Sequence, residues 1–310
     1  MANIVLNHQF FFPYKTFLLG EYAVLEYRQA LLIASKPGFS IDVKNATSCD
    51  AFGAIKQSLG FLHSCPIERE WQSCFEISPF RVMLQQKPLK GFGSSGAWMW
   101  TALILRFYFQ HGIWPELDSH FFQKSMSYYF TLYNHLPKRR RPSGGDMASQ
   151  YFGLCSHIDL HKLVCHKMSW PFIGIGFVLL STGAKVQTYQ HLSMASFTVV
   201  DLQNIFDRAL TAWYDRNASV FIREFIHYQN TLAKQGLQHP NTTFLLEKVS
   251  NSSGFIAAKG CGALGAEVIC VLYDSNFKQQ CLDYYLTLDL HVIATDSDLS
   301  PGLSVTTLDG

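Results

Sequence analysis

The sequence lacks any apolar run long enough to cross a bilayer. Its longest uninterrupted one, PFIGIGFVLL, is far shorter than the roughly 20 residues that a membrane helix needs. The amino-terminal stretch MANIVLNHQFFFPYK has no basic segment followed by an apolar core and a small-residue cleavage site, so no secretory signal is predicted. From these absences we expect a soluble, cytoplasmic protein without a membrane partner.

The sequence also has a low net charge and no closely spaced pair of cysteines. The 310 residues carry a formal net charge of only +2, which gives no general electrostatic case for binding nucleic acid or an anionic membrane. The 8 cysteines are scattered without a CxxC pair, which suits reduced thiols rather than a disulfide framework. Repeats and low-complexity segments do not occur, and the length suffices for one large domain or, as we expect, two.

One polar cluster raises the question of a metal site. His157, His161, Cys165 and His166 lie close together in the sequence. Their segment reads as a hairpin of short strands, whose period-two geometry would not bring all four side chains to one point. We therefore expect a polar sheet face with one buried cysteine, and zinc is the alternative.

Hydrophobic patterning predicts the order of secondary-structure elements. In the first half we expect strands at residues 3–12 and 30–43 and helices at 97–110 and 118–134. The segment LPKRRRPSGGD must be a loop, and MASQYFG begins a helix from it. Beyond residue 170 we expect a buried strand at 172–182 and helices at 201–215, 219–235 and 240–250. A glycine-rich turn at 255–266, a strand at 267–273, a helix at 276–286 and a strand at 291–295 should follow. This order predicts an α+β second half.

The stretch KGFGSSG, residues 90–96, directly precedes an apolar helix candidate. Glycines at that density let the backbone approach a ligand closely, and the two serine hydroxyls can form hydrogen bonds or bind a metal. This pattern is typical of a cradle for phosphate groups at a helix start. The alternative is a strand-to-helix turn in which Ser94 or Ser95 only caps the helix.

Three further segments combine with this one. Lys15 ahead of the Gly-Glu pair offers a cation, PSGGD offers the carboxylate of Asp146 at a flexible turn, and KGCGALGAE, residues 259–267, offers a second close-approach loop. Helix-start amides and a cation suit a polyphosphate, helix-start hydroxyls can hold its magnesium, and a carboxylate can orient an attacking hydroxyl. The combination predicts phosphoryl transfer. The GxxxxGK[ST] pattern of P-loop NTPases and the HRD and DFG motifs of protein kinases are absent.

These motifs, in this order, resemble those of the GHMP kinases, the family of galactokinase, homoserine kinase, mevalonate kinase and phosphomevalonate kinase. The matching segments are KTFLLGEYAVL, GFGSSG, SGGD and KGCGALG, which together span most of the chain. The resemblance implies a two-domain α+β fold. Its ATP-binding first half, residues 1–170, would be ribosomal protein S5 domain 2-like, and its second half, residues 171–310, would be ferredoxin-like.

Within the family, the motifs are most similar to those of phosphomevalonate kinases, because of Tyr22 in GEYAVLE, Gly96 at the end of GFGSSG, and two glycines before Asp146. This implies a kinase of the mevalonate and isoprenoid pathway that makes 5-diphosphomevalonate from 5-phosphomevalonate. The alternatives are a mevalonate kinase, another GHMP kinase acting on a small alcohol, and a catalytically silent binding protein of the same fold. ATP and Mg²⁺ are the implied cofactors, the partner is a small molecule and not nucleic acid, and a monomer or homodimer is expected.

The resemblance also implies roles for individual residues. Asp146 would be the general base or orienting group, Lys15 would hold it ionised, and Ser95 and Asp146 would bind magnesium. The ATP phosphates would be wrapped by Gly91, Gly93, Ser94, Ser95 and Gly96. The acceptor would be bound by Lys15, Tyr22, Ser143, Gly144, Gly145, Thr182, Gly183, Thr188, Lys259 and Gly262. Taken singly, Lys15 could be a solvated strand lysine and Asp146 a helix cap.

A basic run, residues 138–141, shortly precedes Asp146. Arginine is suited to bidentate contact with phosphate, so we expect Arg140 and Arg141 to contribute to binding a phosphorylated acceptor. The alternative is a solvated loop.

Departures from the family pattern bear on function. Leu264 and Ala266 replace glycines of the last motif, so we expect their Cβ atoms to crowd the loop, while Glu267 keeps the acidic place. The segment before SGGD has no carboxylate to serve as a second magnesium ligand, which argues against mevalonate kinase. Tyr14 stands where a glycine usually precedes the first lysine.

Overall fold

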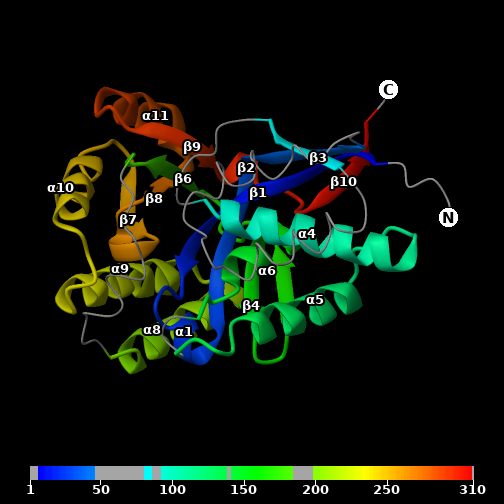
Figure 1. The fold of residues 1–310 in the computed structure, drawn as a ribbon. Coiled ribbons are helices and arrows are strands. Elements are labelled where there is room, and N and C mark those ends of the chain that lie inside the picture. Colours follow the sequence, from blue (N-terminus) through cyan, green and yellow to red (C-terminus); the bar gives the residue numbers. More distant parts are fainter. Residues whose placement is uncertain (1–5, 46–79, 86–91, 138–140, 184–197, 309–310) are drawn as a thin grey trace.

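A long antiparallel hairpin organises the amino-terminal half of the protein. The structure, a computed structural model, describes residues 6–45, 80–85, 92–137, 141–183 and 198–308. Strand β1 (Asn7–Leu19) pairs with β2 (Gln29–Asn45), and the short helix α1 (Val24–Tyr27) joins them (Figure 1). Phe10 and Phe12 of β1 are buried and Phe11 between them is only half-buried, because successive residues of a strand point to opposite faces, whereas residues 12–16 are all buried.

Further strands extend this hairpin into a six-stranded sheet. Its order is β10-β1-β2-β4-β5, with β3 also paired to β2, and all these pairs are antiparallel. The added strands are β3 (Phe80–Leu84), β4 (Cys155–Asp159), β5 (Val164–Met168) and β10 (Ser304–Thr307). Since β10 comes from the end of the chain, the last strand lies beside the first (Figure 1).

Three helices of the first half place the site. They are α4 (Ser94–His111), α5 (Ser119–Leu132) and α6 (Gly145–Phe152), close to the predicted positions. The buried indole of Trp100 in α4 donates a hydrogen bond to the Met147 carbonyl of α6 at 2.9 Å, and its ring lies 4.8 Å from that of Tyr151. Aromatic packing of this kind fixes α4 and α6 against each other.

The second half is ferredoxin-like. Its strands are β6 (Ile175–Ser181), β7 (Phe255–Cys261), β8 (Val268–Asp274) and β9 (His291–Thr295), in the sheet order β7-β8-β6-β9. Its helices are α8 (Val200–Tyr214), α9 (Ala218–Lys234), α10 (Pro240–Val249) and α11 (Lys278–Thr287). Grouping the helices between β6 and β7, the order is β-α-β-β-α-β, which is the split βαβ arrangement. The predicted α+β fold is confirmed.

One apolar core continues between the two sheets. The stripe predicted on α9 is buried, with Phe221, Phe225 and Tyr228 fully covered, and it belongs to the same cluster as the side chains of β1 and β2. A second, smaller cluster lies between the second sheet and the helices α10 and α11. The predicted domain division at residue 170 stays a prediction, and β10 crosses back over it to the first sheet.

The strands β3 and β10 were not predicted, and two other segments differ from the predicted elements. Residues 13–19, where a strand was not predicted, continue β1. Pro13 is tolerated in this strand because the pairing of β1 with β2 shifts register just after it. Residues 255–261, predicted as part of a glycine-rich turn, form β7. Gly260 fits there because its N–H donates to Gln229 Oε1 at 2.9 Å and an added Cβ would lie 2.6 Å from the Gly265 carbonyl oxygen.

The histidine cluster lies on the predicted hairpin of β4 and β5. His157 and His166 are cross-strand partners, and His157 Nδ1 lies 2.7 Å from the Tyr214 hydroxyl. Burial, followed by the charge of His166, lowers the pKa of His157 to about 4, so this ring is neutral at physiological pH. Within the described part of the chain, no group of three or more His, Cys, Asp or Glu side chains is arranged to hold a metal ion.

No helix in the described ranges is both long enough and apolar enough to cross a bilayer.

The contact of the carboxyl-terminal segment with α6 predicts a stability effect. Gly153, which ends α6, has φ +77° and ψ −170°, a region that is essentially restricted to glycine, and an added Cβ would lie 2.2 Å from the Pro301 carbonyl carbon. We expect Gly153→Ala to lower the free energy of unfolding by about 2–4 kcal/mol, measured by urea denaturation.

Gly236→Ala is the matched control. Gly236 also has a positive φ, +70°, but no atom lies within 4 Å of its added Cβ, so only about 1 kcal/mol should be lost. Equal losses in the two variants would contradict the tight contact at Gly153.

Candidate active site

The start of α4 presents backbone amides without a side-chain cap. Gly93, the residue before the helix, is left-handed with φ +92°, and it forms no side-chain cap. Ser94 and Ser95 lie inside the helix, so neither of them is its N-cap residue, and the alternative of a serine cap was wrong. Amides of an uncapped first turn carry partial positive charge and favour an anion. Ser95 is exposed there.

This helix start is held against β1 and α6 by Gln150. Its Nε2 donates to the carbonyl oxygens of Gly93 at 3.1 Å and Pro13 at 3.3 Å, and the Lys15 N–H donates to the Phe92 carbonyl at 3.2 Å. An added Cβ on Gly96 would lie 2.6 Å from Gln150 Oε1, so Gly96 is needed for this close packing. Gly91, the first glycine of the motif, lies outside the described residues.

Lys15 and Asp146 form an ion pair beside this helix start. Lys15 Nζ lies 2.7 Å from Asp146 Oδ1, and the Asp146 side chain is 34% exposed whereas that of Lys15 is 9% exposed. Asp146 stands in the first turn of α6, where the helix dipole favours a carboxylate. The sequence analysis placed these two residues at one site, and the structure brings them together.

The SGGD segment shapes the start of α6. Gly144 has φ +81°, and an added Cβ would lie 2.8 Å from Met126 Cε and from Phe130 Cζ, so a larger residue is excluded. Ser143 Oγ accepts a hydrogen bond from the Gly145 N–H at 3.2 Å. The two glycines therefore serve the turn that presents Asp146.

The second glycine loop follows β7 and includes the short 3₁₀ helix η2 (Ala263–Gly265). Gly262, Leu264 and Gly265 all have positive φ, at +85°, +55° and +61°. The Leu264 carbonyl accepts from the His239 N–H at 2.9 Å, and the Thr242 hydroxyl donates to the Gly265 carbonyl at 3.2 Å. Leu264, whose Cβ was expected to crowd the loop, has the left-handed backbone conformation that a glycine would take.

A small hollow lies between this loop and β1. It is lined by Lys15, Thr16, Phe17, Cys261, Gly262, Glu267 and Val268. Its volume, about 10 Å³ for the centre of a water-sized group, leaves room for about one water molecule. Glu267, at the acidic place of the last motif, therefore lines the same hollow as the site lysine.

Tyr22 and Lys259, both predicted to bind the acceptor, contact other parts of the protein. The Tyr22 hydroxyl accepts from the Leu264 N–H at 2.9 Å, and burial raises the pKa of Tyr22 to about 12. Lys259 is completely buried, and its ammonium contacts the Glu21 carboxylate. Burial alone would lower the pKa of Lys259, but Cys261 and Glu21 outweigh it and the net shift is upward.

Thr182 also contacts the second glycine loop. Its hydroxyl donates to the Ala266 carbonyl and, at 3.2 Å, to the Glu267 carbonyl. Gly183 follows with φ +70°, and no atom of the described residues lies within 4 Å of the Cβ that a substitution would add. Thr188, the other end of the predicted substrate segment, lies outside the described residues.

Arg141 is the described member of the basic run, and Arg140 lies outside the described residues. The Arg141 guanidinium donates to the Leu136 carbonyl at 2.8 Å and to the Asn134 carbonyl at 2.7 Å. These bonds fold the guanidinium back onto its own loop. Arg28, by contrast, donates only a long hydrogen bond of 3.4 Å to the Ser143 carbonyl, and its guanidinium lies 5.0 Å above the Phe130 ring.

The sequence analysis gave no role to Gln150, Glu21 or Arg28. Gln150 stands four residues after Asp146, and this spacing places both on one face of α6, which was the signal available for it. Glu21 lies inside the quoted GEYAVL motif but carried no partner in the sequence. Arg28 had no signal, because only folding brings it to Ser143.

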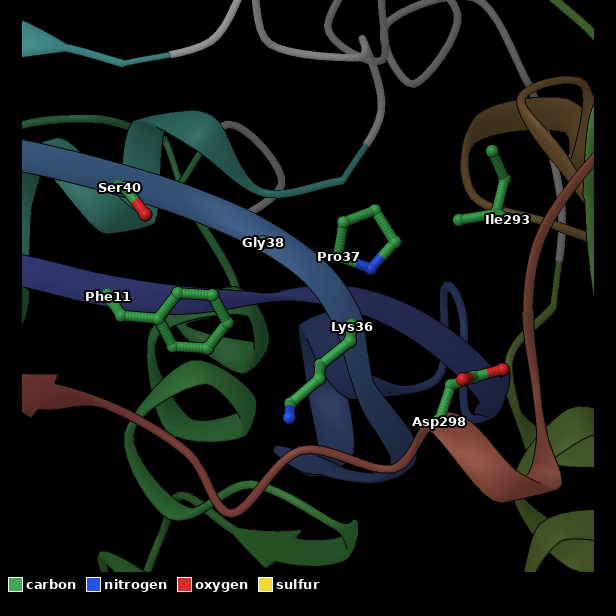
Figure 2. A pocket seen from close by; sticks show the side chains of 7 residues that line it. All are labelled: Phe11, Lys36, Pro37, Gly38, Ser40, Ile293 and Asp298. Carbon is green, nitrogen blue, oxygen red and sulfur yellow. The ribbon is translucent and has the colours of Figure 1, made fainter.

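A larger hollow of about 390 Å³ opens elsewhere on the surface (Figure 2). It lies between β1, β2 and the segment of β9 and the 3₁₀ helix η4 (Asp296–Asp298), and is lined by Phe11, Lys36, Pro37, Gly38, Ser40, Ile293 and Asp298. None of the predicted site residues lines it, so its size does not make it the candidate site.

Comparison with solved structures defines the class of fold. The structure is similar to Methanococcus jannaschii mevalonate kinase (TM-score 0.67, 13% identity, covering 95% of this chain and 99% of that one). It is also similar to Streptococcus pneumoniae phosphomevalonate kinase (0.65, 13%, 94% and 99%) and to a homoserine kinase from Cytophaga hutchinsonii (0.66, 11%, 99% and 99%). The protein therefore has the GHMP kinase fold. No protein-family profile matches the sequence, and no curated protein is detectably similar to it in sequence.

The burial of Cys261 predicts its reactivity. This thiol is 1% exposed, and burial raises its pKa to about 11, so only about one molecule in a thousand would carry the thiolate at about pH 8. We expect iodoacetamide to leave Cys261 unmodified in the folded protein and to alkylate it in guanidinium chloride, measured by peptide mass spectrometry. Comparable rates in the two conditions would contradict the burial of this thiol.

Proposed function

We propose that the protein is an ATP-dependent small-molecule kinase that phosphorylates 5-phosphomevalonate. The observation that carries this proposal is the Lys15–Asp146 ion pair of 2.7 Å next to the uncapped start of α4. A cation, a carboxylate and helix-start amides are the parts that phosphoryl transfer needs, since its catalysis is mostly positioning and charge stabilisation. The shared fold supports the class of reaction, and a complex of the Streptococcus pneumoniae enzyme holds phosphomevalonate and AMPPNP.

In this proposal the start of α4 binds the ATP phosphates. The amides of Ser94 and Ser95 would face the phosphate oxygens, and the packing of Gly93 and Gly96 on Gln150 would keep that turn in place. The exposed hydroxyl of Ser95 and the carboxylate of Asp146 are oxygen donors of the kind that Mg²⁺ prefers, so they fit a magnesium ion that accompanies ATP. Magnesium, when bound, would offset the charge of the phosphates.

Asp146 and Lys15 would act on the acceptor. Asp146 would orient the acceptor oxygen and accept its proton, where it carries one, and Lys15 would hold the carboxylate in place and offset charge in the transition state. A loose transition state makes little demand on a base, so orientation is the larger share of the role of Asp146.

The choice of an anionic acceptor rests on cations close to the SGGD loop. Arg28 is half-buried, has no carboxylate partner among the described residues and reaches the carbonyl of Ser143, three residues before Asp146. Burial, followed by the charge of Arg141, lowers the pKa of Arg28, as is expected where like charges lie close together. An anion there would relieve this repulsion. Arg28 is therefore a better candidate for acceptor binding than Arg141, whose donors are used by its own loop.

Mevalonate is the second candidate acceptor, because mevalonate kinases share the fold. A catalytically silent binding protein is the remaining alternative, since the last motif departs from the family pattern at Leu264 and Ala266.

A coupled ADP-release assay tests the proposal. We expect ADP release with 5-phosphomevalonate, and a fall of about 100-fold or more in kcat for Asp146→Asn, because the amide can neither accept a proton nor pair with Lys15 in the same way. Asp201→Asn, an exposed helix position, is the matched control and should keep wild-type rates.

The same assay with mevalonate, homoserine and galactose separates the candidate acceptors. If the folded protein binds ATP but none of these acceptors releases ADP above background, the kinase proposal fails. Full activity of Asp146→Asn would remove Asp146 from the mechanism.

Replacement of Arg28 tests the anionic acceptor. We expect Arg28→Gln to raise the KM for 5-phosphomevalonate about tenfold or more, because a charge-assisted hydrogen bond is lost, and to leave the KM for ATP unchanged. Arg216→Gln is the matched control, since Arg216 is exposed and shares the left-handed backbone of Arg28, with φ of +53° and +58°. An equal KM in wild type and Arg28→Gln would exclude Arg28 from acceptor binding.

A further inference from the structure

A buried ion pair joins the two halves of the protein next to the candidate site. Lys259 in β7 is 0% exposed and its ammonium contacts the carboxylate of Glu21, which is 4% exposed and lies 238 positions earlier in the chain. Among the ion pairs between described residues, this is the one that joins the first 170 residues to the rest. It lies at the end of β7 from which the second glycine loop begins.

This ion pair is not arranged for stability alone. Lys259 also donates to the Gly260 carbonyl at 3.0 Å, but Glu21 Oε2 is buried without a hydrogen-bond partner. Because removing two charges from water is costly, a buried pair that leaves an oxygen unsatisfied contributes little net stability. Such pairs can instead specify one arrangement of the elements that carry them.

Tyr22 extends this connection to the loop itself. Tyr22 and Leu264 both have left-handed backbones, with φ of +63° and +55°, and the Tyr22 hydroxyl accepts the Leu264 N–H at 2.9 Å. A non-glycine residue adopts this conformation at a cost, so something else must hold Leu264 in it. The hydroxyl of Tyr228 adds to the connection by donating to the Glu21 carbonyl at 2.6 Å.

The loop that Tyr22 holds is the one that faces Lys15. Gly262 and Glu267, at its two ends, line the small hollow together with Lys15. A displacement of Leu264 would therefore move the wall of this hollow. We call the four residues Glu21, Tyr22, Lys259 and Leu264 the clasp.

We propose that the clasp positions the second glycine loop against Lys15, so that Tyr22 and Lys259 are positioning residues which act on acceptor binding through the loop rather than by touching the acceptor. The link to acceptor binding rests on the proposed function. Among the described residues, no hydrogen bond or ion pair joins the clasp to the start of α4, so it should affect the acceptor and not ATP.

Tyr22→Phe tests the clasp without breaking the buried ion pair. We expect it to raise the acceptor KM about threefold to tenfold, through the lost hydrogen bond, with the KM for ATP unchanged. Tyr285→Phe is the matched control, because Tyr285 is fully buried and its hydroxyl lies 2.7 Å from Ser252 Oγ in the separate core cluster. Both variants should lower Tm by a similar few degrees. If loss of stability were the cause, the acceptor KM would change equally in Tyr22→Phe and Tyr285→Phe, and that result would overturn the proposal.

Leu264→Gly in the Tyr22→Phe background distinguishes positioning from direct contact. Glycine adopts the left-handed conformation without help, so we expect the double variant to return the acceptor KM to within about twofold of wild type. A KM that stays at the value of Tyr22→Phe would mean that the hydroxyl touches the acceptor, and would overturn the proposal.

Alkylation of Cys261 provides a readout that does not depend on activity. If the loop loosens, the hollow opens, and iodoacetamide should modify Cys261 at least about threefold faster in Tyr22→Phe than in Tyr285→Phe. Equal rates would show that the clasp does not hold the loop. A wild-type protein that phosphorylates none of the acceptors would defeat the proposed function, whereas the alkylation rates would still decide whether the clasp exists.

Discussion

The ion pair between Glu21 and Lys259 sets a constraint on which the rest of the site depends. Both groups are almost fully removed from water, and a charge in such a place is tolerated only with its partner present. The turn after β1 and the start of the second glycine loop therefore have to occur at the same point in space. Lys15, on the strand that leads into this turn and six residues before Glu21, is thereby fixed relative to Gly262 and Glu267.

Around this constraint the site is built mainly from backbone geometry. Gly93 at the start of α4, Gly144 before α6 and Gly262 after β7 all take positive φ, and each one turns the chain so that amides or a carboxylate face a common region. Side chains then hold the turns, as Gln150 holds Gly93 and Tyr22 holds Leu264. Preorganised dipoles of this kind are what the transfer of a highly charged group requires. The same architecture occurs in a mevalonate kinase, a phosphomevalonate kinase and a homoserine kinase.

Much of the fold could be predicted from local sequence patterns. The helices α4, α5, α8 and α9 carry apolar stripes or runs that identify them, and the β4–β5 hairpin follows from short alternating segments. Two strands, β3 and β10, were not predicted because each is short and pairs with a strand distant in the sequence. β3 pairs with β2, and β10 pairs with β1. β7 was hidden by its glycines, since Gly260 is unfavourable in an isolated strand and is explained only by the close approach of Gly265.

For the site, the sequence by itself determined which residue types would meet: a lysine, a carboxylate after two glycines, and a serine pair at a helix start. The contact of Lys15 with Asp146 was implied by the resemblance of these motifs to those of the GHMP kinases, and each motif could be found because it is local and lies within a few residues. Only the tertiary structure decided that Lys259 contacts Glu21, that Tyr22 accepts the Leu264 N–H, and that Arg28 reaches the Ser143 carbonyl whereas Arg141 bonds to its own loop. The physical reason is that these choices depend on burial and on partners distant in the sequence, and neither can be read from a local pattern.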